Sequence, residues 1–365
     1  MSLWTNLLSQ LVNLKAFRPF FPLARTIGDF FVLPVHLLGS GGRANAFPFV
    51  INFHVTTQCN LKCYYCFNAA NCVPGADELP LEFYRGLAER WARHRPGIFI
   101  SGGEPLARPD LPDIIEAFKR QNLPVAMVTN GTLLDEAQVR HLAHLGLDIM
   151  LVSFHGVGPT HDEAVGQAGA YRKSMQALRW WHKYRGGRSP MINYIISPAS
   201  VKDLPRFMDE VADLRLTYLR MSHFNFLTPE EINCQKEFWR GRFDETPLEI
   251  LSYQYKPETA AFEPLFDFLR SEKGRQLFIK PKLNDRELRQ WYSSKANLDR
   301  RCVFIWRSTF VNAQGDVYPC QSMYLRLGNL RQQSMEEIWN NELYCKFRKE
   351  IKQGLMPGCA RCCKN

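Results

Sequence analysis

The sequence contains no uncharged apolar run that approaches the ~18 residues needed by a membrane-spanning helix. It also lacks a secretory signal: the first lysine is Lys15, so no basic segment precedes an apolar core. Internal repeats and low-complexity tracts are absent as well. We therefore expect a cytoplasmic, reducing location, where clustered cysteines hold metal more often than they form disulfides.

Acidic side chains are fewer than basic ones, 36 against 46, which leaves a net charge of +10. This excess favours an anionic partner such as nucleic acid, a membrane surface or a phosphorylated ligand, and ordinary solubility charge is the alternative. With 365 residues, of which 45% are hydrophobic and 22% charged, the chain has the composition of a globular protein and not of a disordered one.

Residues 1–48 are predicted to form an amphipathic, apolar N-terminal extension. Leu3, Leu7, Leu8 and Leu11 recur at helical spacing, with Ser, Asn and Gln between them. Such a stripe can lie in a membrane interface, which would give residues 1–45 a peripheral membrane contact on the cytoplasmic face. The alternative is a helix packed against the rest of the protein or a partner subunit.

Residues 49–230 alternate between strand-like runs and amphipathic helical segments. The strand-like runs are FVINFHVTT, GIFISGG, PVAMVTNG, DIMLVSFHG, MINYIIS and TYLRMSHFNF. Six strand–helix alternations predict an α/β fold with a parallel sheet, either open or curled into a barrel. Ligands then bind at the carboxyl ends of the strands, where the most informative motifs occur.

Three cysteines follow the first predicted strand at CxxxCxxC spacing: Cys59, Cys63 and Cys66. A zinc site takes four ligands, usually as two pairs. Three thiolates on one short loop suit a [4Fe–4S] cluster with one iron left open. Cys72 is a competing fourth ligand at longer spacing, and three structural cysteines are the alternative without metal.

The segment CNLKCYYC resembles the defining motif of the radical S-adenosylmethionine (SAM) enzymes. The resemblance implies that the three cysteines bind a [4Fe–4S] cluster whose fourth iron binds SAM, and that Tyr65 lies against the adenine. SGGEP, at the end of the second strand, resembles the GGEP motif of that family, in which the glutamate meets the SAM amino group. The SAM contacts implied there are Gly102, Gly103, Glu104 and Pro105.

Further family-like features end the third, fourth and fifth strands. TNG contains Asn130, VSFHG contains Ser153, and the fifth strand contains Asn193. The resemblance implies that these three side chains contact SAM. His155 stands where relatives often have Asp, and the Arg often found after HD is missing, so no other contact from that loop is carried over.

A second cysteine set, made of two distant pairs, occupies the last 65 residues: Cys302, Cys320, Cys359 and Cys362, with Cys363 and Cys345 as alternative ligands. Four thiolates alone would suit zinc. The arrangement resembles the C-terminal SPASM and twitch domains of radical SAM enzymes, which hold auxiliary clusters. The resemblance implies a partial (β/α)6 TIM-like barrel over 49–230 and a small α+β domain over 301–365 with one auxiliary [4Fe–4S] cluster. Residues 231–300, which are rich in aromatics, Pro and charge, are predicted to form a helical linker or cap.

The resemblance implies an oxidoreductase or transferase-type enzyme that reductively cleaves SAM to a 5′-deoxyadenosyl radical and abstracts hydrogen from a substrate. The auxiliary cluster would assist electron transfer during dehydrogenation, epimerisation or bond formation. A small molecule, a lipid-linked one included, is the expected substrate, and a peptide- or protein-modifying maturase is the alternative. An electron donor such as flavodoxin or ferredoxin is expected and nucleic acid is not. The alternative of another class is a zinc-binding, non-enzymatic protein that binds nucleic acid.

Overall fold

The computed structural model describes residues 40–66, 77–185, 191–214, 218–223, 225–243, 249–250, 253–271, 274, 278–281, 283–293, 296 and 300–362. Most of the predicted N-terminal extension lies outside these residues, as do Cys72 and Cys363.

Six strands and the helices that connect them form the first part of the fold. The strands are β1 (Val50–His54), β2 (Gly97–Ser101), β3 (Val125–Thr129), β4 (Ile149–Phe154), β5 (Met191–Ile196) and β6 (Tyr218–His223). The helices are α3 (Leu81–Trp91), α4 (Leu111–Arg120), α5 (Glu136–His144), α6 (Pro159–Val165), α7 (Ala170–Tyr184) and α8 (Leu204–Glu210). All adjacent pairs among β1–β6 are parallel. The predicted barrel-type α/β fold is confirmed.

Local sequence explains where these helices form. In α4, Leu111, Ile114, Ile115 and Phe118 are buried at the spacing of one helical face. Helix α5 begins at a capping box, in which Asp135 accepts a hydrogen bond from the Gln138 N–H at 2.7 Å and the Gln138 side chain accepts one from the Asp135 N–H at 2.9 Å.

The segment after β6 extends the sheet at one edge. It contains β7 (Phe226–Leu227), α9 (Pro229–Phe243), β8 (Glu249–Ile250), β9 (Tyr253–Gln254), α10 (Glu263–Arg270), β10 (Phe278–Lys280) and α12 (Asp285–Trp291). Strand β10 pairs in parallel with β6, with Ile279 opposite Met221. The description of residues 231–300 as helical is therefore incomplete, because a three-residue strand leaves no periodic pattern in the sequence.

The C-terminal segment extends the same sheet at the other edge. It contains β11 (Ser308–Val311), β12 (Asp316–Tyr318), β13 (Met323–Tyr324), β14 (Gly328–Asn329), α13 (Met335–Trp339) and α14 (Glu342–Gln353). Strand β11 pairs in parallel with β1, and β12 pairs antiparallel with β11. One sheet of order β10-β6-β5-β4-β3-β2-β1-β11-β12-β14 thus joins the two parts of the chain.

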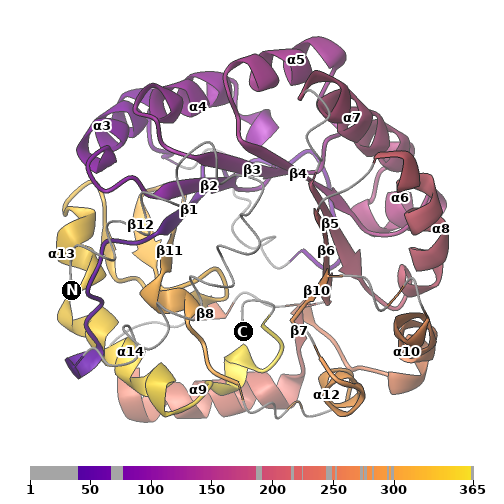
Figure 1. Ribbon diagram of the computed structural model, residues 1–365. Coiled ribbons are helices and arrows are strands. Elements are labelled where there is room, and N and C mark those ends of the chain that lie inside the picture. Colours follow the sequence, from indigo (N-terminus) through magenta and orange to yellow (C-terminus); the bar gives the residue numbers. More distant parts are fainter. Residues whose placement is uncertain are drawn as a thin grey trace.

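The sheet is curved, and the helices lie on its outer side (Figure 1). Side chains alternate between the two faces. On β1, the fully buried Phe53 packs outward against Tyr84, Trp91 and Phe118 of α3 and α4. Asn52 therefore points to the inner face, as do the residues at the matching positions of the other strands.

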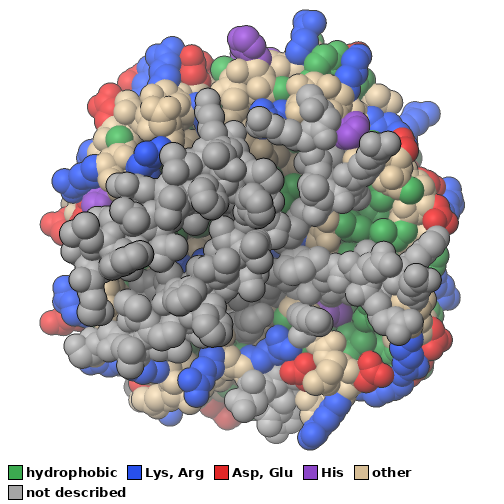
Figure 2. All heavy atoms as spheres, in the orientation of Figure 1, with side chains coloured by type: hydrophobic (Ala, Val, Ile, Leu, Met, Phe, Trp, Pro, Cys, Tyr) green, Lys and Arg blue, Asp and Glu red, His purple; other side chains and the backbone are tan. Residues whose placement is uncertain are grey.

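The outer surface carries both signs of charge. Figure 2 shows Lys and Arg side chains around the whole rim of one face, with Asp and Glu among them.

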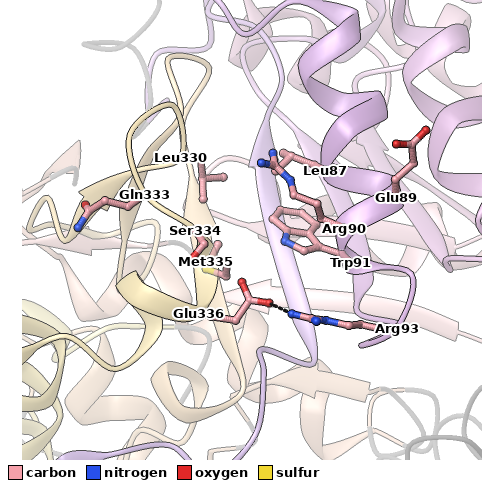
Figure 3. Close-up of a pocket in the computed structure, with 10 residues that line it drawn as sticks. All are labelled: Leu87, Glu89, Arg90, Trp91, Arg93, Leu330, Gln333, Ser334, Met335 and Glu336. Carbon is pink, nitrogen blue, oxygen red and sulfur yellow. Dashed lines mark hydrogen bonds and ion pairs between the residues drawn. The ribbon is translucent and has the colours of Figure 1, made fainter.

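A cavity of about 530 Å³ lies between α3 and residues 330–336, where Arg93 pairs with Glu336 at 3.0 Å (Figure 3). It contains none of the predicted site residues. In the part of the chain that the structure covers, no helix is long and apolar enough to cross a membrane.

Candidate functional site

The first cysteine loop follows β1 at the carboxyl end of the strands. Cys59 and Cys66 are exposed and Cys63 is partly buried. The loop backbone is fixed by α6: the Lys62 N–H donates to the Val165 carbonyl at 3.1 Å, and the Tyr64 N–H donates to the Ala164 carbonyl at 3.2 Å. All three thiols are therefore held on one ordered loop.

The turn after β2 presses directly against this loop. The Gly103 N–H donates to the Thr56 carbonyl at 2.9 Å, and the Glu104 N–H donates to the Gln58 carbonyl at 2.7 Å. A Cβ atom added to Gly103 would lie 2.2 Å from the Gln58 oxygen and 3.0 Å from the Cβ of Cys59. Only glycine permits this approach.

Glu104 ties the β2 turn to the β3 turn. Its carboxylate accepts hydrogen bonds from the Thr129 hydroxyl at 2.7 Å, the Asn130 N–H at 2.8 Å and the Leu106 N–H at 3.2 Å. Burial raises the pKa of Glu104 to about 7, although these three bonds act in the opposite direction. Because a carboxylate has about four lone-pair sites, acceptor capacity for a further donor remains.

Asn130 links the third strand to the cysteine loop. Its side-chain amide donates to the Asn60 side chain at 3.0 Å, and its side-chain oxygen accepts from the Thr132 N–H at 2.8 Å. The Asn60 amide in turn donates to the Thr132 hydroxyl at 2.8 Å. The cysteine loop and the TNG turn thus form one hydrogen-bonded unit.

Tyr65, next to Cys66, is buried and bonded to His155, the residue that follows β4. Its hydroxyl lies in hydrogen-bond contact with Nδ1 of His155, and its ring meets Tyr64 edge-on at 4.4 Å. The backbone N–H of His155 donates to Nδ1 of His161 at 3.2 Å. Burial lowers the pKa of His155 to about 3 and, together with the neighbouring His161, keeps its ring neutral. His155 therefore orients Tyr65.

Ser153 and Asn193 lie opposite each other on β4 and β5, each half-buried. Asn193 also accepts a hydrogen bond from Ser222 of β6 at 3.3 Å. The side chain of Arg220, next to them on β6, also points to the inner face. Its neighbours Leu219 and Met221 are buried in the core on the outer face, and side chains alternate along a strand. Arg220 is the only Asp, Glu, Lys or Arg in strands β1–β6.

Two supports of the loop, the partly buried Glu78 and the buried Arg108, were not predicted. Glu78 accepts hydrogen bonds from the Thr56 hydroxyl at 2.8 Å and the Thr57 N–H at 2.7 Å. Arg108 donates to the Val55 carbonyl at 2.7 Å and to Asp110 at 2.6 Å. Lone charged residues on loops carry no spacing signal, so sequence reasoning had no means of finding them.

The second cysteine set surrounds the start of β11. Burial raises the pKa of the Cys302 thiol to about 12, and the adjacent Cys320 adds to this rise. Burial, Cys320 and Cys302 likewise raise the pKa of Cys359 well above its usual range. The Cys362 N–H donates to the Cys359 carbonyl at 3.2 Å. The structure therefore brings both predicted pairs to one region.

The two cysteine sets lie at opposite ends of the strands: the first at their carboxyl ends, the second at their amino ends. Cys59 follows the carboxyl end of β1, whereas Cys302 precedes β11, which runs parallel to β1. Strand β12 runs antiparallel to β11, with Tyr318 opposite Phe310. Cys320 follows β12 and therefore lies toward the amino end of β11. The inner faces of the strands, including Asn193 and Arg220, lie between the two sets.

The donor chemistry fits iron–sulfur clusters at both places. Seven of the nine described cysteines lie in the two sets, and thiolates are the protein ligands of such clusters. Among the described residues no three His, Cys, Asp or Glu side chains converge on a point where one metal ion could be held. The ligands of a four-iron cluster bind different irons and need no such common point.

Comparisons with known proteins agree with this geometry. Residues 53–211 match the family model of the radical SAM superfamily, and residues 302–363 match that of an iron–sulfur cluster-binding domain, SPASM. An AdoMet-dependent heme synthase of Methanosarcina barkeri is 27% identical over 84% of this chain and 86% of its own. A PqqA peptide cyclase of Granulibacter bethesdensis is 26% identical over 87% and 79%. The structure of Streptococcus suis SuiB bound to S-adenosylmethionine covers 83% of this chain and 68% of its own, with a TM-score of 0.59 at 15% identity.

Proposed function

Because the chain belongs to the radical SAM superfamily and carries a SPASM-type cluster-binding domain, we propose that it oxidises a substrate held inside the barrel by hydrogen abstraction. The observation that carries this proposal is the position of the two cysteine sets at opposite ends of one sheet. A substrate on the inner face would have a radical source on one side and an electron acceptor on the other.

Residues of the first site would hold the SAM cluster and SAM itself. Cys59, Cys63 and Cys66 would bind a [4Fe–4S] cluster, which supplies the electron that cleaves SAM to methionine and a 5′-deoxyadenosyl radical. Gly102, Gly103, Glu104 and Pro105 would form the backbone cradle for the methionyl group, with Glu104 accepting from its amino group. Tyr65, Asn130, Ser153 and Asn193 would contact the rest of the molecule.

The chain's own task is to orient SAM and exclude water. Supporting this task, the loop, the β2 turn and the β3 turn form a single hydrogen-bonded unit that needs little reorganisation on binding. Cys302, Cys320, Cys359 and Cys362 would hold the auxiliary cluster. With all four thiolates bound to it, that cluster suits electron transfer better than direct substrate binding.

For the substrate we infer an anionic group, which Arg220 would bind. Arg220 points to the inner face of the strands, and a guanidinium can donate two parallel hydrogen bonds to a carboxylate or phosphate. A relative's name refers to heme and another's to a peptide, so both a small molecule and a peptide fit this inference. We propose a small molecule, with peptide modification as the second candidate.

We further propose a cytoplasmic location, an electron donor such as flavodoxin or ferredoxin, and membrane contact through residues 1–45, the segment with the apolar helical stripe. Co-sedimentation with liposomes should fall when residues 1–45 are deleted. Unchanged binding would exclude that segment as the membrane contact.

The proposal is tested on protein reconstituted without oxygen. About eight irons per chain should fall to about four in the Cys59/Cys63/Cys66→Ala variant, with loss of 5′-deoxyadenosine formation under dithionite. Zinc in place of iron, or 5′-deoxyadenosine formation that survives in the variant, would refute the proposal and reopen the interpretation as a zinc-binding protein.

A further inference from the structure

Helix α9 buries polar side chains where an apolar stripe would be expected. Its buried residues are Glu231, Gln235, Trp239 and Phe243, which recur every four residues and so share one face. Gln235 is completely buried and Glu231 is 5% exposed. Burying a carboxylate and an amide costs free energy unless both are hydrogen-bonded, so their partners explain why they are there.

Glu231 is paired with Arg361, which lies between Cys359 and Cys362 and is itself fully buried. The same carboxylate accepts hydrogen bonds from the Thr228 N–H at 2.9 Å and the Ala296 N–H at 3.2 Å. Its charge is therefore compensated within the protein, and so is that of the arginine.

Arg361 is also fixed on its other sides. Its Nε donates to the Trp291 carbonyl at 2.7 Å and its Nη2 to the Ser293 carbonyl at 2.6 Å. Its guanidinium lies over the Phe226 ring, 4.4 Å from the centroid. The residue between the two cysteines thus contacts α9, the end of α12 and β7 at once.

Gln235 holds the start of the same loop, one helical turn further along α9. Its side-chain oxygen accepts a hydrogen bond from the Gly358 N–H at 2.8 Å. The fit is close: a Cβ added to Gly358 would lie 2.5 Å from the methyl group of Met323 and 3.2 Å from Gln235. In Figure 1 the C-terminal turn lies directly against α9.

We propose that Glu231 and Gln235 are positioning residues that preset the loop carrying Cys359 and Cys362 to receive the auxiliary cluster. This inference rests on the proposed function, in which those two cysteines are cluster ligands. Helix α9 lies between the two segments matched by the family models, 53–211 and 302–363, so this support comes from the part of the chain that neither covers.

The test uses the full-length Cys59/Cys63/Cys66→Ala variant as the parent, so that only auxiliary iron is counted. Glu231→Gln keeps the shape of the side chain and removes its charge, and Gln235→Leu removes the acceptor for Gly358. Glu230→Gln, on the exposed face of the same helix, is the matched control. Iron release to a chelator is followed after anaerobic reconstitution, once circular dichroism has shown that each variant is folded.

We expect iron release at least ten-fold faster in Glu231→Gln and Gln235→Leu than in Glu230→Gln. A second parent, with Cys302, Cys320, Cys359 and Cys362 changed to Ala, should release its iron at the same rate with and without Glu231→Gln. A purely structural role would accelerate release from both parents. If one variant does not fold, the other still decides the outcome.

Equal release rates in all variants of the first parent, or acceleration in both parents, would overturn the inference. A first parent that binds no iron at all would instead refute the auxiliary site, and this inference with it. Wild-type protein that holds about eight irons but forms no 5′-deoxyadenosine under dithionite would count against the proposed function of the first site alone.

Discussion

Single residues set how closely the β2 turn approaches the cysteine loop. Gly103 has no room for a methyl group, because the Gln58 carbonyl and Cys59 occupy that space. Gly86, in the middle of α3, has nothing within 4 Å of the corresponding position. The two glycines therefore differ in what they contribute: Gly103 permits the close approach of two loops, whereas Gly86 lies in open space on a helix.

Gly103→Ala should displace the backbone that carries Cys59. Overpacking of this kind costs about 1–3 kcal/mol, and we expect at least half of the iron at the first site to be lost. Gly86→Ala should instead stabilise the protein by about 0.5–1 kcal/mol, because a helix interior favours alanine. Iron analysis and denaturant unfolding measure both effects. An equal iron content in the two variants would contradict this account of Gly103.

Arg220→Met should leave SAM cleavage without substrate within about two-fold of the parent, because the proposed partner of Arg220 is the substrate. Arg220→Lys, which keeps the charge, should retain more substrate turnover than the methionine variant, since a charge-assisted hydrogen bond contributes roughly 1.5–3 kcal/mol. The measurement is 5′-deoxyadenosine formation together with SAM affinity. A large loss of SAM affinity would assign Arg220 to SAM and not to the substrate.

At the scale of elements, one arginine joins α14 to its surroundings. Arg348 of α14 is fully buried between the rings of Trp339 and Tyr344, at 4.2 and 3.8 Å. Its guanidinium donates to the Ile305 carbonyl at 3.0 Å and to the Trp339 carbonyl at 2.8 Å. The helix is thereby connected to the segment that leads into β11.

Arg348→Met should destabilise the protein by about 2–5 kcal/mol, since it leaves buried carbonyl groups without donors. Lys352→Met, on the exposed side of α14, should change stability by less than about 0.5 kcal/mol. Chemical denaturation compares the two. A similar midpoint for both variants would show that the carbonyl groups find other donors.

The helices and strands also show which features of the fold can be predicted from the sequence. All six barrel strands and five of the helices between them were predicted, because each has a strong periodic pattern. Helix α6 and strand β10 were not, since PTHDEAV has no stripe of large apolar residues and three residues are too few to show a period. Motif spacing selected both cysteine sets, whereas Glu78, Arg108 and the polar face of α9 act through contacts distant in sequence that no local pattern encodes.

At the scale of the whole molecule, the opposite positions of the two cysteine sets predict that they act independently in SAM cleavage. Changing Cys302, Cys320, Cys359 and Cys362 to Ala should lower iron from about eight to about four per chain. The formation of 5′-deoxyadenosine should continue within a few-fold, because the first site keeps all its ligands. Iron analysis and chromatography measure the two quantities. Complete loss of 5′-deoxyadenosine would show that the first site depends on the second.

The pairing of β1 with β11 also has a consequence for how the protein is made. During synthesis at about 5–20 residues per second, β1 waits roughly 13–50 s until the ribosome has added residues up to 311. Throughout that interval one edge of an apolar strand is unpaired and open to wrong partners. We therefore expect slower synthesis or scarce chaperones to reduce the yield of protein able to accept its clusters.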